Sequence, residues 1–394
     1  LIKEVRATGL PQVNASGSYT DNFALPTQLL PGEILGQPGT TVPVTFGVRH
    51  NMAAGVELNQ LLFSKSYFTG LKAAEASKGL YQLNTLQTKE ELVYSIAQVY
   101  LQLQINKRQQ EILNANLQRV EKLVEITQAQ FDEGLVKKVD VDQLRVNRTN
   151  LQTEIQSLEI GYGQQMSLLK FNMGMDVNEQ IEVAGLDDED SKYELVESPM
   201  LSYNTTLRLL NKQNELTGLE LQSVKDGYYP TLSAFASYNW QGQTNKLFSS
   251  ETDMNSFGAG MWGVRLSIPI FDGFEKKFKA QQVEVSQRQL DLNIRNVTNL
   301  TKMEFHNASE QLRQSKKLID QQQENMELAE QLYDITKLSY QEGVAPLTEL
   351  LNAETSLKEA QTQFLTATLQ LKLAELDHLK TSGELARIIE SSTK

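Results

Sequence analysis

An internal duplication constrains the fold of this chain more than any other feature of its sequence. The segment from Phe131 to Val136 has a counterpart from Tyr340 to Ala345, and six residues after the glycine of each segment stands a carboxylate, Asp140 or Glu349. The spacing between the two copies is about two hundred residues. A repeat of that length indicates a duplicated domain rather than a solenoid of small units.

Proline interrupts helices and sheet interiors, and its distribution leaves two long stretches uninterrupted. No proline occurs between Pro43 and Pro199 or between Pro269 and Pro346. Apolar residues recur there at every seventh position, a spacing that keeps one side of a helix against a partner helix. We therefore predict coiled-coil helices, each long one followed after the repeated turn by a second helix. The predicted helices cover residues 66–131, 139–173, 274–340 and 347–385.

Four short segments alternate apolar and polar residues, the pattern of strands whose two faces meet different surroundings. They cover residues 11–21, 51–63, 228–241 and 258–271. Aromatic residues near the strand ends favour a lipid-facing band, while a single segment of this kind also suits a half-buried sheet in a soluble domain. The predicted lipid-facing residues are Leu232, Tyr238, Trp240, Trp262, Val264, Leu266 and Ile268. Phe235 departs from the alternation, because it falls among the polar residues.

The predicted fold class is mainly α with a small membrane β part, built from a duplicated β-β-α-α unit. Residues 1–185 form the first repeat, 186–227 an acidic linker with a helix, and 228–394 the second repeat. Four strands cannot close a barrel, and free edges would leave backbone groups unpaired in lipid. We therefore expect the chain to form an oligomer. Three chains, for example, would supply a β-barrel of twelve strands continued by a coiled-coil tunnel of twelve helices.

Composition excludes several classes of function. A net charge of −12 argues against a nucleic-acid partner, because a phosphate backbone requires clustered Lys and Arg. Cysteine is absent, which excludes disulfides and thiolate metal sites. His50, His306 and His378 are isolated, and the sequence has neither a phosphate-binding loop nor a nucleophile elbow. We therefore predict that the protein is not an enzyme and has no cofactor or metal.

The chain resembles the TolC-like outer-membrane efflux proteins over nearly its whole length. Both turn motifs carry this likeness, together with Gly263 to Gly273, Tyr229-Pro230 and Leu10-Pro11. The resemblance implies a homotrimer in the outer membrane of a Gram-negative-type cell, with a large periplasmic part and an equatorial helix after the acidic linker. It also implies a channel of a tripartite efflux or type I secretion system, which passes small molecules or proteins outward together with a periplasmic adaptor and an inner-membrane transporter.

The same resemblance assigns roles to residues at the periplasmic end. Glycine permits each tip to reverse, and small apolar neighbours offer a docking surface for the adaptor. The implied docking residues are Gly134, Leu135, Val136, Gly343, Val344 and Ala345. Tyr340 matches the family's gate tyrosine and Asp140 its carboxylate partner, which implies a phenol-to-carboxylate hydrogen bond. Glu349 and Asn352 match two aspartates one helical turn apart, so the resemblance implies a cation-binding ring at Glu349.

A soluble trimeric coiled-coil scaffold or adhesin without a pore is the alternative from another class. It would share the seven-residue repeats but not the duplicated amphipathic strand pairs. Extraction separates the two, since a channel stays with the membrane until detergent is added. Drug efflux and protein secretion are not distinguished, because in the resembled family the pump and the adaptor choose the cargo.

Overall fold

The computed structural model describes residues 1–36, 39–186, 193, 195–247 and 254–392. The chain divides into two compact units. Residues 1–80 and 212–291 form the sheet unit, and residues 81–211 and 292–394 form the tip unit. Each unit takes segments from both sequence repeats, so the units and the repeats divide the chain differently. The acidic run 187–190 of the predicted linker lies outside the described residues.

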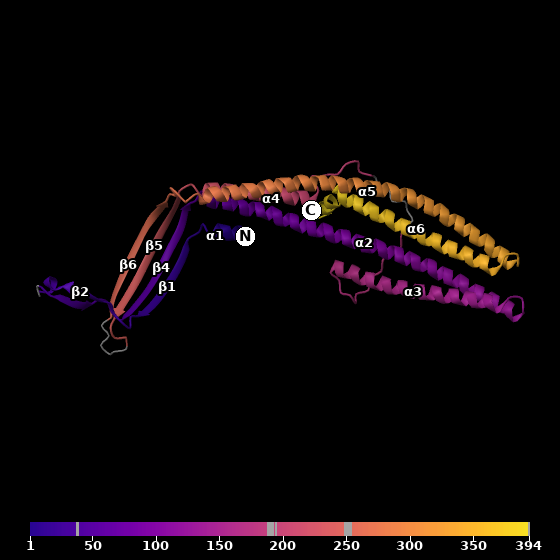
Figure 1. Cartoon of the computed structure of the whole chain (residues 1–394), viewed down its shortest axis with the longest axis horizontal. Coiled ribbons are helices and arrows are strands. Elements are labelled where there is room, and N and C mark those ends of the chain that lie inside the picture. Colours follow the sequence, from indigo (N-terminus) through magenta and orange to yellow (C-terminus); the bar gives the residue numbers. More distant parts are fainter. Residues whose placement is uncertain (37–38, 187–192, 194, 248–253, 393–394) are drawn as a thin grey trace. The chain divides into compact units, whose positions relative to one another are not determined.

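The sheet unit contains a four-stranded antiparallel sheet in the order β1-β4-β5-β6 (Figure 1). Its strands are β1 (Gln12–Asp21), β4 (His50–Phe63), β5 (Thr231–Thr244) and β6 (Asn255–Ser267). β5 begins at Thr231 rather than near residue 228, because Pro230 has no N–H to donate to the ladder. β6 ends at Ser267, ahead of Pro269, so Ile268 lies beyond the strand that was expected to contain it.

The segment between β1 and β4 lies outside the predicted strands, but it contains secondary structure. β2 (Thr27–Pro31) pairs with β3 (Thr41–Thr45) as a small antiparallel hairpin, and a 3-10 helix, η1 (Gly32–Leu35), follows β2. A short helix, α1 (Ile2–Ala7), precedes β1. The Pro- and Gly-rich composition of this segment argues against strands, although residues 41–45 alternate in the manner of a strand.

Besides α1, the sheet unit contains segments of the longer helices α2 (Lys65–Asp132), α4 (Thr205–Asp226) and α5 (Glu275–Gln341). The first turn of α2 contacts the end of α4, where Ser66 Oγ donates to Ser223 O at 3.2 Å. Asp226 is 4% exposed, and Lys65 Nζ lies 3.3 Å from its carboxylate. Since a buried charge needs a partner, this ion pair fixes the point where strands and helices meet.

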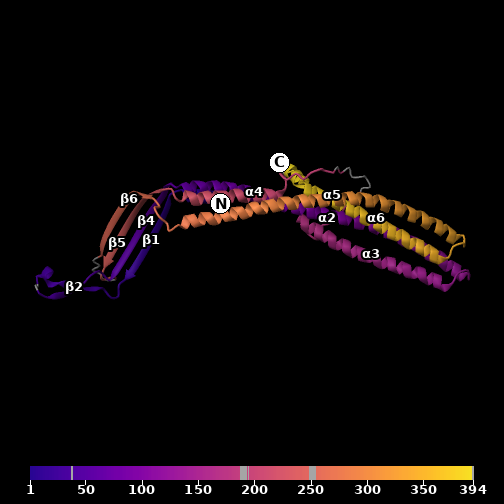
Figure 2. The ribbon, with the colours of Figure 1, turned by 45° about the horizontal axis from the view of Figure 1, so that its top comes forward.

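In the tip unit, α2 and α3 (Lys138–Met173) form one helical hairpin, and α5 and α6 (Leu347–Ser382) form another (Figure 2). Both hairpins contribute to a shared core of Leu123, Leu144, Tyr333, Leu347, Leu350, Ala353 and Leu357. The predicted helix 347–385 is interrupted, because Gly383 adopts a left-handed φ of 84° and ends α6. A separate helix, α7 (Glu384–Ser392), follows. Within the described ranges, no helix combines the length and apolar character needed to cross a membrane.

Candidate functional site

The four-stranded sheet has one apolar and one polar face. The pairing register sets Val13, Leu58, Ala236 and Trp262 side by side on the apolar face. On the polar face, it sets Asn14, Glu57, Ser237 and Met261 in the next row. Of the residues predicted to face lipid, the apolar face carries Leu232, Tyr238, Trp240, Trp262, Val264 and Leu266. Trp262 is 83% exposed in the single chain, so this face is available to lipid or to another protein.

Both edges of this sheet are open within the described part of the chain. β1 pairs only with β4, and β6 pairs only with β5. An edge strand presents a row of unpaired N–H and C=O groups, which is a template for pairing with another strand. Another strand could therefore pair with this sheet at β1 or at β6.

The two helical hairpins of the tip unit turn in the same way at their ends. Gly134 has a φ of 75° and Gly343 a φ of 72°, the left-handed conformation that glycine adopts without steric strain. The N–H of the next residue, Leu135 or Val344, donates to the carbonyl five residues earlier, at 2.8 and 2.9 Å. This bond satisfies a carbonyl that the helix end would otherwise leave unpaired. The repeated motif of the sequence is thus a repeated helix-ending turn.

The side chains at the two tips project into solvent. Leu135 is 75% exposed and Val344 is 81% exposed. Val136 and Ala345, which were also predicted to dock the adaptor, are half-buried. Each tip therefore presents one exposed aliphatic side chain next to its glycine, and the docking role itself stays a prediction.

The predicted gate residues Tyr340 and Asp140 are not hydrogen-bonded to each other in the described part of the chain. The Tyr340 hydroxyl lies 3.2 Å from Oγ1 of Thr127, which is fully buried on α2. Asp140 Oδ2 instead accepts from Lys137 N at 3.1 Å, which caps the start of α3. Tyr340 still links the two hairpins, because it lies on α5 and its partner lies on α2. The gate role of Tyr340 and Asp140 stays a prediction.

Glu349 and Asn352 lie on the exposed side of the first turns of α6. A carboxylate in the first turn of a helix is stabilised by the helix dipole, which accounts for Glu349 within one chain. A ring of such carboxylates requires further copies of the chain, so the cation-binding role stays a prediction. Among the described residues, no three His, Asp or Glu side chains are grouped so that they could hold a metal ion.

A buried carboxyl group between the two hairpins was not identified from the sequence. Glu354 on α6 is 6% exposed, and its Oε2 accepts from Asn147 Nδ2 on α3 at 3.1 Å. Burial raises the pKa of Glu354 to about 6, while the nearby charges of Arg119 and Lys358 and the bond from Asn147 oppose the rise. The hydroxyl of Tyr333 on α5 is also buried, without a hydrogen-bond partner among the described residues.

The sequence did contain a signal for Glu354. It follows Leu350 by four residues and precedes Leu357 by three, so it falls on the apolar stripe of α6 rather than on its polar side. A charged residue at such a position is either paired or shifted in pKa. The spacing therefore predicts burial, and only the structure identifies Asn147 as the partner.

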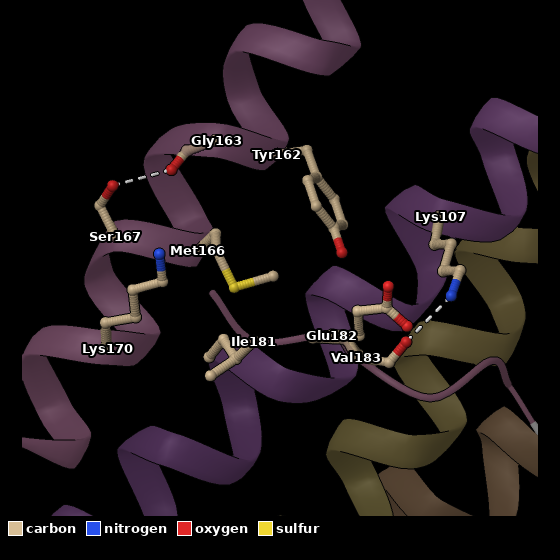
Figure 3. Close-up of a pocket in the computed structure, with 9 residues that line it drawn as sticks. All are labelled: Lys107, Tyr162, Gly163, Met166, Ser167, Lys170, Ile181, Glu182 and Val183. Carbon is tan, nitrogen blue, oxygen red and sulfur yellow. Dashed lines mark hydrogen bonds between the residues drawn. The ribbon is translucent and has the colours of Figure 1, made fainter. Parts of the chain in front are cut away.

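A pocket of about 530 Å³ lies between α2, α3 and the segment after α3 (Figure 3). Lys107 Nζ donates to Val183 O at 3.0 Å, and Lys170 Nζ donates to Val177 O at 2.8 Å. Tyr162 lines the pocket between these two ends. Because both ammonium groups are used to hold the backbone of residues 177–183 against the helices, we assign the pocket a structural role.

Comparison with known proteins decides the family. The sequence pattern of the family described as outer membrane efflux protein matches residues 1–165 and 201–380, which is most of the chain. The chain belongs to the outer membrane efflux protein family. Its membership confirms the predicted outer-membrane location and a role in transport, and it also confirms that the protein is not an enzyme.

Individual relatives agree with this assignment. The chain is 21% identical to the outer membrane protein TolC of Salmonella enteritidis over 335 residues, which cover 82% of this chain and 67% of that protein. VceC of Vibrio cholerae has a similar fold, with a TM-score of 0.74 and 17% identity, covering 97% of this chain and 89% of that one. The CmeC outer membrane channel of Campylobacter jejuni gives a TM-score of 0.78 at 14% identity, covering 100% of this chain and 83% of that one. The soluble-scaffold alternative is not favoured.

Proposed function

We propose that this protein is one subunit of a homotrimeric channel that conducts small molecules or proteins across the outer membrane. Three copies of the sheet would join edge to edge, β6 of one copy to β1 of the next, and close a barrel of twelve strands in contact with outer-membrane lipid. The observation that carries the proposal is the combination of two open edges with an exposed apolar face. In hydrocarbon, unpaired edges are costly, and closure removes them.

The helices would continue the barrel as a tunnel of twelve helical columns. α5 supports this part of the proposal, because Leu328 and Ile335 are seven residues apart and are 58% and 66% exposed. Apolar residues at that spacing pack against a partner helix. Among the described residues, nothing covers these two side chains, so a second copy is the partner that the proposal supplies.

The two tips would dock a periplasmic adaptor, which would connect the channel to an inner-membrane transporter. Leu135 and Val344 support this assignment, because exposed aliphatic side chains on a rigid turn suit insertion into apolar grooves. Neither Leu135 nor Val344 is a charged residue that would have to be desolvated on docking.

The gate would lie close to the tips. Tyr340 and Thr127 would hold the two hairpins together in the closed state, while Asp140 would keep the start of α3 in place. Three Glu349 carboxylates around one axis would raise the local concentration of cations and disfavour anions. Asn352, one helical turn further on, would add polarity to this constriction without adding charge.

Reconstitution into planar lipid bilayers tests the proposal. We expect discrete conductance steps and a reversal potential that shows cation preference. Glu349→Gln should reduce that preference, whereas Asn352→Ala, the matched control, removes an amide without changing charge and should leave it unaltered. Folded protein that is inserted in the bilayer and carries no current would contradict the proposed function.

A further inference from the structure

The proposed channel leaves the position of Phe235 unexplained. The register pairs Phe235 with Asn59 on β4 and with Gly263 on β6, so its ring stands among polar residues. A β-carbon at Gly263 would lie 3.1 Å from two atoms of the Phe235 ring, a contact tighter than side chains normally make. Glycine at this position therefore leaves the space that the ring occupies, and the ring leans over β6.

Arg265 lies over this ring. It follows Gly263 by two residues and therefore stands on the same face, where the register pairs it with Ser233. Its guanidinium lies 5.1 Å from the centre of the Phe235 ring, which is a cation–π distance. Within the described ranges, the guanidinium forms no hydrogen bond or ion pair, and the side chain is exposed. Its five N–H donors are therefore directed to water.

No carboxylate neutralises this guanidinium on the described part of the polar face. Glu57 is the other charged residue of that face, and the register sets it beside Ser237 rather than beside Arg265. Its Oε1 accepts from Asn59 Nδ2 at 2.9 Å. In a chain with a net charge of −12, Arg265 is thus a fixed cation that keeps its charge available for a ligand.

We propose that Phe235 and Arg265 form a binding site for planar organic anions on the polar face of the sheet. A carboxylate or sulfonate accepts two hydrogen bonds from the guanidinium fork, and the attached aromatic ring stacks on the guanidinium plane or on Phe235. This site rests on the proposed function, in which the polar face lines a water-filled passage. Three copies would present three such sites, so aromatic anions would be retained longer than other solutes.

The chemistry of the pair selects against other ligands. An aromatic cation could stack on Phe235, but it would be repelled by Arg265. An aliphatic anion could pair with Arg265, but it would lack the stacking contact. Selectivity for both features together is therefore the property that distinguishes this site from a single surface arginine.

Binding of naphthalene sulfonate to the detergent-purified protein, followed by the fluorescence of this probe, tests the site. We expect Arg265→Gln to weaken binding about tenfold and Phe235→Leu to weaken it about fivefold. Arg265→Lys should give an intermediate affinity, because it keeps the charge and loses the planar fork. Hexane sulfonate and naphthyl trimethylammonium should bind more weakly than the probe to the unmodified protein.

Two variants serve as matched controls. Phe257→Leu removes another aromatic ring from the polar face, near the opposite end of β6, and Lys279→Gln removes a positive charge from α5. Both should bind the probe as the unmodified protein does. The site is overturned if Arg265→Gln and Phe235→Leu keep full affinity, or if Phe257→Leu loses as much affinity as Phe235→Leu.

A bilayer recording separates this inference from the channel itself. Naphthalene sulfonate in the aqueous phase should reduce the current of the unmodified protein more than that of Arg265→Gln. Protein that conducts but binds the probe independently of Arg265 and Phe235 contradicts the site and leaves the channel standing. Protein that binds the probe through these residues but does not conduct contradicts the channel and leaves the site standing.

Discussion

The helices α3 and α6 occupy corresponding places in the two repeats and have the same length, 36 residues. Each begins after a hairpin tip and ends at a glycine in the left-handed conformation, Gly174 or Gly383. They differ in burial, since fourteen residues of α6 are buried in the chain and only five of α3. Although the two helices have the same backbone structure, the rest of the chain buries much more of α6 than of α3.

The side chains explain this difference. α6 alternates large and small residues along its seam, as in Leu350, Ala353 and Leu357, which lets neighbouring helices approach closely. α3 leaves Ile160 65% exposed and Phe171 74% exposed. A set of exposed apolar residues along one helix marks an interaction surface. α6 thus stabilises the subunit, and we propose that α3 offers a surface for another copy.

Leu350→Ala is expected to have the largest effect on this comparison. Leu350 is fully buried, and replacing a buried leucine with alanine costs about 2–5 kcal/mol, because contacts are lost and a cavity remains. A truncation at an exposed position of α3, Ile160→Ala, should change the free energy of unfolding by less than about 0.5 kcal/mol. Thermal denaturation of the two variants in detergent measures the difference.

Trimer formation should rank the two variants in the opposite order, with the larger effect for Ile160→Ala than for Leu350→Ala. Ile160→Ala is expected to lower the fraction of trimer on dilution, because it removes part of the surface that another copy would cover. Native mass spectrometry of the detergent-extracted protein measures this fraction. Should Ile160→Ala dissociate no more readily than the unmodified protein, α3 would not be the assembly surface and the comparison would fail.

The next largest effect should be the pH dependence of stability that the carboxyl group of Glu354 causes. Burial raises the pKa of its carboxyl group to about 6, so the folded chain binds the proton more tightly than the unfolded chain does. The stabilisation is fully present below the ordinary value of 4.5 and is lost as pH rises through about 6. We expect a loss of about 2 kcal/mol across this window. Urea unfolding at a series of pH values measures it.

Glu354→Gln is the control for this pH effect, because it keeps the size of the side chain and removes the titration. His378 acts in the opposite sense, since burial lowers the pKa of its ring and its contribution to stability is lost as pH falls. The difference between the unmodified protein and Glu354→Gln isolates the carboxyl group. An identical pH profile for the two proteins would rule out Glu354 as the titrating group.

Charges at the two tips should have a smaller effect on stability and a clear effect on export. Leu135→Glu and Val344→Glu change exposed side chains and leave the left-handed glycines in place, so the turns should form normally. Each is expected to reduce export about tenfold, because a charge would be buried on docking. Susceptibility of cells to an exported compound measures this loss.

Gln152→Glu, on an exposed position of α3, adds the same charge away from the tips and is the matched control. It should export normally. Equal losses at both tips would indicate that the adaptor contacts the two repeats alike, while a loss at one tip alone would extend the asymmetry of α3 and α6 to their turns. Normal export by both tip variants would contradict docking there.

The smallest expected effect concerns the hydroxyl of Tyr340. The corresponding residue of the first repeat is Phe131, so Tyr340→Phe makes the repeats alike and removes the bond to Thr127. A hydrogen bond of this kind contributes about 0.5–1.5 kcal/mol, so the open probability should rise a few-fold. Single-channel recording of Tyr340→Phe, Thr127→Val and the double variant should show that the two effects are coupled.

Asp140→Ala, combined with Tyr340→Phe, gives a second double-mutant cycle for comparison with the pair of Tyr340 and Thr127. Asp140 caps α3 in this structure, so its effect should add to that of Tyr340→Phe without coupling. Coupling between Tyr340 and Asp140, with none between Tyr340 and Thr127, would instead support the bond that the family resemblance implied.

Much of the fold followed from local patterns in the sequence. The repeated turn was predictable because only glycine fits its left-handed residue, and the two faces of the strands were predictable because side chains alternate with a period of two. The break at Gly383 was missed, since the seven-residue repeat continues as far as His378 and so favoured a single uninterrupted helix.

The partners of individual side chains were less predictable. A seven-residue repeat shows which side of a helix is apolar, but it does not show which helix lies opposite. The resemblance implied a bond between Tyr340 and Asp140, and the contact of Tyr340 with Thr127 was not foreseen. The pairing of Glu354 with Asn147 was not predicted from the sequence for the same reason.

The most direct test of the central claim uses the absence of cysteine from the chain. Ser16→Cys on β1 and Ala259→Cys on β6 place one thiol on each open edge of the sheet, in the same row of the register. A short bis-maleimide is then applied to the protein in its membrane. We expect linked dimers and trimers, with the trimer as the largest product. Monomers alone, or a ladder that continues past the trimer, would contradict a channel closed by three copies.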